Sequence, residues 1–116
     1  MDIEILKIAS DTKNHKVLDK CTHKAKQKNS MCGDEMDVSV KIVKDQILDF
    51  GYQCKSCIFC QASASVISKY VKDLMVKNLD KIETHKNFTT LINKKYIARK
   101  ECVLLPYEAL KKAINN

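Results

Sequence analysis

The sequence is poor in residues that interrupt regular structure, with two glycines, one proline and no tryptophan among 116 residues. It contains no Gly-rich phosphate loop, no nucleophile elbow and no paired-carboxylate arrangement. Nucleotide-dependent and hydrolytic enzymes rely on such motifs to hold a phosphate, a nucleophile or a proton donor in a fixed geometry. Neither class of chemistry is therefore supported.

Long apolar runs are also missing. Residues 1–16 carry charges at Asp2, Glu4 and Lys7 and lack the apolar run of ~7 to 15 residues that a signal peptide needs. No stretch approaches the ~18 apolar residues of a membrane span. At this length we expect a single domain over residues 1–116, in the cytoplasm and away from the membrane.

The charge is basic, with 21 Lys and Arg against 14 Asp and Glu, a formal net charge of +7. The excess is spread along the chain, and Lys94-Lys95-Tyr96 and Arg99-Lys100 are its main basic pairs. Such scattered pairs are more often a solvated face than a nucleic-acid site. A nucleic-acid-binding module is thus a disfavoured alternative, which steeply salt-dependent binding to DNA or RNA would reveal.

Alternating apolar and polar residues predict a strand over 36–42, with one buried face. A polar pair, Lys44-Asp45, separates it from a second expected strand over 47–52, so a hairpin is predicted. Residues 21–27 are a candidate edge strand.

Apolar residues at spacings of three and four predict a helix that begins near Ile58 and continues through 62–75. A second helical segment is expected between about 79 and 95, and Pro106 is expected in the first turn of a last helix. For residues 1–20 a short helix and a frayed arm remain equal alternatives. Together these elements predict an α+β fold, a small antiparallel three-stranded sheet with helices packed on one face.

Six cysteines are the outstanding feature of the composition. In a reducing compartment, clustered thiols are more often metal ligands or redox groups than disulfides. Cys54, Cys57 and Cys60 form a C-x2-C-x2-C run, and thiolates at this spacing suit zinc, copper(I) or iron–sulfur clusters. A ferredoxin is disfavoured because Ala64-Ser65 stands where a fourth cysteine and a proline would follow. The alternative is that these thiols are small buried hydrophobic groups.

Three further positions have a local setting for chemistry. Cys57 precedes a predicted helix start, where amide donors and the helix dipole stabilise a thiolate, and Cys102 has a similar setting. Gly33 lies between Cys32 and Asp34 and suggests a tight bend that directs both at one point. We expect Cys32, Cys57 and Cys102 to converge, although a turn-capping role remains open for Asp34.

Several motifs together resemble the U-type iron–sulfur scaffold family, which comprises IscU, SufU and the N-terminal domain of NifU. They are Cys32-Gly33-Asp34, Cys57 followed by Ala62-Ser63-Ala64-Ser65, Arg99-x-x-Cys102, and the Leu-Pro-aromatic-x-Ala-Leu run over 105–110. The likeness covers about residues 22–116.

The resemblance implies that Cys32, Cys57 and Cys102 bind metal and accept sulfur, and that Asp34 tunes cluster lability or ligates zinc. It implies a non-enzymatic scaffold or carrier that holds a transient [2Fe-2S] cluster. The implied partners are a cysteine desulfurase, an iron or electron donor, and apo iron–sulfur proteins or a carrier. The alternative is a SufU-like zinc-dependent sulfurtransferase.

The sequence also departs from the family pattern. Glu101 stands where IscU proteins have a histidine before the third cysteine, and Cys54 and Cys60 are additions. Whether Glu101, Cys54 or Cys60 joins the site is left open, with Cys60 the better candidate of the two thiols. The histidines His15, His23 and His85 are expected at the surface.

Cys21 is predicted to be dispensable, because it lies among lysines without a partner motif. Cys21→Ser should leave the bound metal per protein unchanged when iron, sulfide and zinc are assayed after purification. A substantial loss of metal from a folded variant would mean that the wrong thiols have been chosen.

Overall fold

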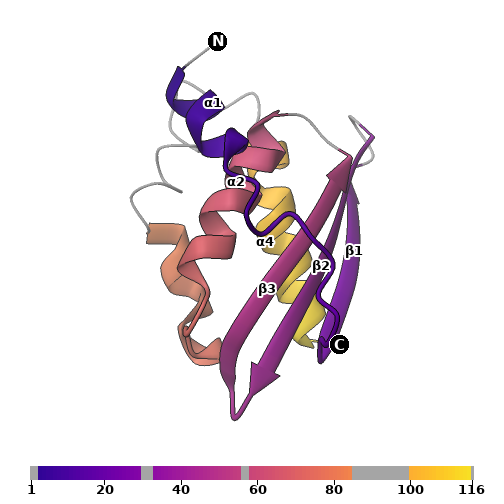
Figure 1. The fold of residues 1–116 in the computed structure, drawn as a ribbon, viewed down its shortest axis with the longest axis vertical. Coiled ribbons are helices and arrows are strands. Elements are labelled where there is room, and N and C mark those ends of the chain that lie inside the picture. The colour runs from indigo at the N-terminus through magenta and orange to yellow at the C-terminus, as the bar shows by residue number, and fades with distance from the viewer. Residues whose placement is uncertain (1–2, 30–32, 56–57, 85–99, 116) are drawn as a thin grey trace.

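The computed structural model describes residues 3–29, 33–55, 58–84 and 100–115 (Figure 1). Its elements are, in order, helix α1 (Ile3–Ser10), strands β1 (His23–Asn29), β2 (Asp34–Val43) and β3 (Gln46–Lys55), helix α2 (Ile58–Tyr70), the 3₁₀ helix η1 (Val76–Thr84) and helix α4 (Lys100–Asn115). The predicted α+β class is confirmed. Of the two alternatives for residues 1–20, the helix is present, as α1.

The three strands form one antiparallel sheet in the order β1-β2-β3. The hairpin between β2 and β3 turns at Lys44 and Asp45, which both have positive φ, 52° and 63°. Positive φ at both central residues is the signature of a type I′ turn, whose twist matches that of the flanking strands. The predicted hairpin is therefore confirmed, and the candidate edge strand is displaced only slightly from its expected start.

One face of the sheet forms half of the hydrophobic core. Val38 pairs with Tyr52 and Val40 with Phe50, and all four side chains are buried together with Met36. Helices α2 and α4 cover this face, while the opposite face is turned toward the viewer in Figure 1. Each fully buried apolar side chain of this kind contributes about 1.5–3 kcal/mol, so the alternation along β2 is what fixes the helices to this side.

Helix α2 carries three buried serines, whose hydroxyls bond to α4 and to the segment that follows α1. The Ser63 hydroxyl donates to the Val103 carbonyl in α4 at 2.5 Å. The Ser65 hydroxyl donates to the Asp11 carbonyl at 3.0 Å, and the Ser68 hydroxyl accepts from the Asn14 amide at 3.1 Å. A buried hydroxyl is costly without such a partner, so these bonds determine which segments can lie against α2.

The last helix differs from the prediction. Pro106 is not in its first turn but lies inside α4, which begins at Lys100. Proline has no N–H to donate to the carbonyl four residues earlier, at Cys102, and its ring crowds that carbonyl. The burial of Leu105, Tyr107 and Leu110 offsets that loss, and the helix continues through the proline.

The helical segment expected over 79–95 is a 3₁₀ helix where the structure describes it. Leu79 and Ile82 face inward as predicted. Their spacing of three residues brings them onto one face of a helix with three residues per turn. The rest of this expected segment lies outside the described residues.

Residues 11–18 connect α1 to the sheet by crossing its outer face, in front of the strands in Figure 1. Asn14 lies at the edge of β3, where its carbonyl accepts from the Tyr52 amide at 3.2 Å. The Leu18 amide then donates to the Ser39 hydroxyl at 3.2 Å. Gly51 lies beneath the crossing, and a Cβ there would be 2.5 Å from the Lys16 carbonyl oxygen.

None of the helices in the described part of the chain combines the length and the apolar character that a membrane span requires.

Gly51→Ala should lower the free energy of unfolding by about 1–3 kcal/mol, because the new methyl group would overlap backbone that is held on both sides. Urea denaturation would measure the change, with Gln53→Ala at an exposed position of the same strand as the control. Equal stabilities for the two variants would show that the crossing segment does not pack as described.

Candidate functional site

The predicted site residues fall on different parts of the structure. Cys102 lies in the first turn of α4 and is buried, with 4% of its surface exposed. It is therefore inside the helix and not ahead of it, as the expected start at Pro106 had implied. Asp34 is the first residue of β2, but its side chain lies outside the description, as do Cys32 and Cys57.

The described neighbours of these residues gather at one end of the molecule. Glu35 pairs with Lys55, so β2 begins where β3 ends. Helix α2 begins at Ile58, just after β3, and α4 begins at the same end of the molecule (Figure 1). We call this region, where β2, α2 and α4 begin, the site end. It is the arrangement that a convergence of Cys32, Cys57 and Cys102 requires.

Gly33 has the conformation that was predicted for the turn into β2. Its φ is +73°, in the left-handed region that favours glycine, and no atom lies within 4 Å of the position of a Cβ. The glycine is therefore required by the backbone bend between the positions of Cys32 and Asp34, and not by a close contact.

The position of Cys102 depends on the packing of two helices. Its neighbour Val103 accepts the hydrogen bond from Ser63 of α2. Ala62 and Ala64 flank that serine and are fully buried. The first turn of α4 is thereby held against α2.

An ion pair lies at the start of β2. The Lys28 ammonium lies 2.8 Å from the Glu35 carboxylate, and its hydrogen bond lowers the pKa of Glu35 and raises that of Lys28. Lys26 and Lys55 also lower the pKa of Glu35 through their charges. The carboxylate of Glu35 thus lies among three lysines.

The other described cysteines differ in exposure. Cys60 is fully buried in the core, whereas Cys21 and Cys54 are half-buried. Within the described ranges no three His, Cys, Asp or Glu side chains are placed to hold a metal ion. Because two of the predicted ligands and the Asp34 carboxylate are outside those ranges, the ligand set remains a prediction.

Sequence reasoning missed a contact between a thiol and a histidine. His15 is exposed, as expected, but its Nε2 lies 3.8 Å from Cys54 Sγ. The two residues are 39 positions apart, and no spacing or local motif links them. His23 is half-buried, with its Nδ1 2.7 Å from the Thr22 hydroxyl, and His85 lies outside the description.

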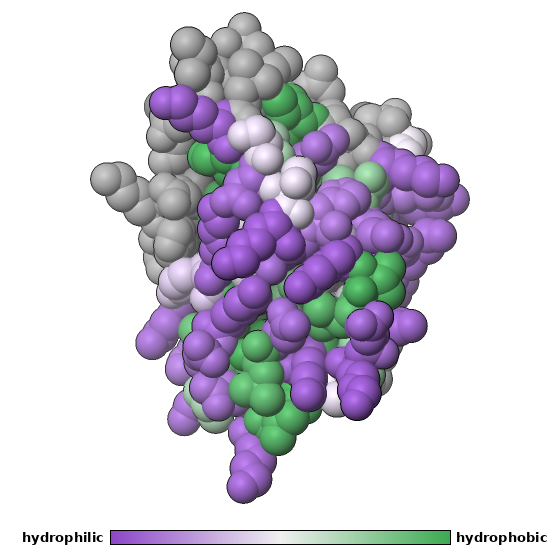
Figure 2. All heavy atoms as spheres, viewed as in Figure 1, coloured by the Kyte–Doolittle hydropathy of each residue, from purple (hydrophilic) through white to green (hydrophobic). Residues whose placement is uncertain are grey.

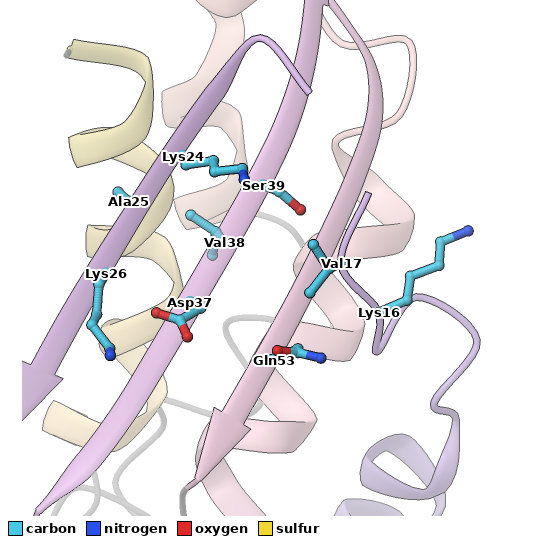
Figure 3. Close-up of a pocket in the computed structure, with 9 residues that line it drawn as sticks. All are labelled: Lys16, Val17, Lys24, Ala25, Lys26, Asp37, Val38, Ser39 and Gln53. Atoms are coloured by element: carbon cyan, nitrogen blue, oxygen red, sulfur yellow. The ribbon is translucent and has the colours of Figure 1, made fainter. Parts of the chain in front are cut away.

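A groove of about 340 Å³ lies on the outer face of the sheet (Figure 3). Lys16, Lys24 and Lys26 line it together with Asp37 and Gln53. The surface around it is mostly hydrophilic (Figure 2). None of the described residues that line this groove is a cysteine.

Comparison with known proteins gives the chain a family. The profile of the NifU-like N terminal domain matches residues 2–116. The chain is 29% identical over 126 residues to the iron–sulfur cluster assembly scaffold protein IscU of Thermotoga maritima, covering 95% of this chain and 89% of that protein.

Two solved structures share the fold. The structure of a protein from Fervidobacterium islandicum, described as an iron–sulfur cluster assembly scaffold for the SUF system, has a TM-score of 0.82 at 22% identity and covers 98% of this chain and 96% of that one. The N-terminal part of a NifU-like protein from Brucella abortus has a TM-score of 0.85 at 21% identity, covering 98% and 91%. With the family match over nearly its whole length, this chain belongs to the NifU-like N-terminal domain family.

Proposed function

We propose that this protein is a scaffold on which a labile iron–sulfur cluster, [2Fe-2S], is assembled and from which the cluster is transferred. The observation that carries the proposal is the family match over residues 2–116. The gathering of β2, α2 and α4 at one end of the fold supports it, because the proposed ligands lie on or beside those three elements.

Cys32, Cys57 and Cys102 are the proposed thiolate ligands. Thiolates are the soft donors that iron–sulfur clusters prefer. Cys102 is buried in the first turn of α4, and Cys57 directly precedes α2 in the chain. Unpaired amide donors and the helix dipole at such positions favour a thiolate and an anionic cluster.

Asp34 is the proposed fourth, weaker ligand or a proton-managing neighbour. A carboxylate oxygen is a harder donor than a thiolate and binds iron less tightly. Three thiolates with one oxygen therefore suit a cluster that has to leave, whereas electron-transfer sites favour four thiolates.

Sulfur is proposed to arrive as a persulfide from a cysteine desulfurase. A site thiolate attacks the outer sulfur, and the desulfurase leaves as a thiolate, so the new persulfide forms without a further oxidant. Iron and electrons come from other donors, and the finished cluster goes to apo iron–sulfur proteins or a carrier. On this proposal the protein is a carrier in the cytoplasm and not an enzyme.

A zinc-dependent sulfurtransferase is the second candidate, because three thiolates and one carboxylate also suit tetrahedral zinc. The two candidates differ in what the protein holds after native purification. Iron with acid-labile sulfide supports the scaffold, while zinc with no cluster after anaerobic reconstitution with a desulfurase supports the sulfurtransferase.

Asp34→Ala should leave cluster formation intact but slow transfer to an apo-ferredoxin by about tenfold, because the ligand that helps to open the site is removed. Absorption spectroscopy would follow assembly and transfer. Asp37→Ala, at an exposed position of the same strand, is the matched control. An unchanged transfer rate together with a loss of bound zinc would favour the sulfurtransferase instead.

A further inference from the structure

Cys54 and His15 form a thiol–imidazole pair that the proposed ligand set does not use. Cys54 Sγ lies 3.8 Å from His15 Nε2. Cys54 is half-buried next to the last residue of β3, at the site end, and His15 is exposed. A soluble electrophile can therefore reach the pair.

The imidazole is held in place by its surroundings. Its ring packs edge-on against the Tyr52 ring, with centroids 5.1 Å apart and an interplanar angle of 78°. The preceding residue, Asn14, is 3% exposed, and its side chain donates to Ser68 and accepts from Lys72. Because both the His15 ring and the preceding Asn14 are held in place, His15 loses little conformational freedom when it contacts Cys54.

His15 is the base available to this thiol. Burial raises the pKa of the Tyr52 hydroxyl to about 12, so this group stays protonated near neutral pH and cannot take a proton from Cys54. Asp11 forms an ion pair with Lys69, and that hydrogen bond lowers the pKa of Asp11 and keeps its carboxylate engaged. The imidazole nitrogen of His15, 3.8 Å from Cys54 Sγ, is the group positioned to take the proton of the thiol.

We propose that Cys54, with His15 as its base, is an additional sulfur-accepting site that takes sulfane sulfur from persulfides. The inference rests on the proposed function for its biological purpose, since a cluster scaffold consumes sulfane sulfur. Its position favours this role, because Cys54 precedes Cys57 by three residues in the chain.

The chemistry balances without an external oxidant or reductant. His15 takes the proton of Cys54, and the thiolate attacks the outer sulfur of the donor persulfide. A new S–S bond forms at Cys54 while the donor's S–S bond breaks. The donor leaves as a thiolate and takes up the proton from the imidazolium, so one thiol and one persulfide exchange a sulfur atom.

Two other thiols in the same molecule serve as internal comparisons. Cys21 is half-buried like Cys54, but its thiol contacts no imidazole in the part of the chain that the structure describes. Cys60 is fully buried and closed to a donor. Trypsin places Cys54 and Cys21 on different peptides. Cys54 is the one cysteine of peptide 45–55, and Cys21 is the one cysteine of peptide 21–24.

The test exposes the full-length protein to glutathione persulfide, then alkylates it and maps persulfides by mass spectrometry. Cys54 should gain sulfur at least about tenfold faster than Cys21, because a positioned base speeds the step. His15→Ala should reduce the Cys54 rate to that of Cys21, while His23→Ala should leave the Cys54 rate unchanged. Thermal melts of all variants would check folding.

Equal rates at Cys54 and Cys21 in the wild-type protein, or a Cys54 rate that survives His15→Ala, would overturn the inference. Reconstitution separates it from the proposed function. Cys54→Ser should slow cluster formation from a persulfide donor but not from inorganic sulfide. If the wild-type protein forms no cluster from either source, the scaffold proposal fails, while the labelling rates still decide the role of Cys54.

Discussion

Most of this fold depends on the buried hydrogen bonds of one helix. The serines of α2 are buried away from water, so the hydroxyl of each has to bond to a group in another segment. Ser63 holds the first turn of α4, and Ser65 and Ser68 hold the segment that runs from α1 to the sheet. The helix therefore determines where both flanking segments lie, in addition to covering the sheet.

These constraints act at the end of the molecule where the chemistry is proposed. The bond to Val103 places the buried Cys102 beside α2, and the sheet register brings the start of β2 to the end of β3. The same anchoring brings His15 to Cys54. Structural polar contacts and candidate reactive groups are thus parts of one network.

Local pattern predicted the sheet well. Alternation along β2 and the polar pair at Lys44-Asp45 depend on neighbouring residues, and both strand and turn are present. Prediction was wrong at Pro106, because a local rule for helix starts could not weigh the burial of Leu105 and Leu110 on either side of it. It also left the first twenty residues open, since the partners that hold them lie far along the chain.

The sequence by itself determined the α+β class, the strand pairing and the family, since each depends on local periodicity or on motifs that are read in order. It also identified Cys32, Asp34, Cys57 and Cys102 as candidates through motif likeness. The tertiary structure alone decided that Cys102 is buried inside α4, that Cys60 belongs to the core and that His15 contacts Cys54. The physical reason is that burial and contact depend on which distant segments pack together, and the spacing of residues along one chain does not encode those partners.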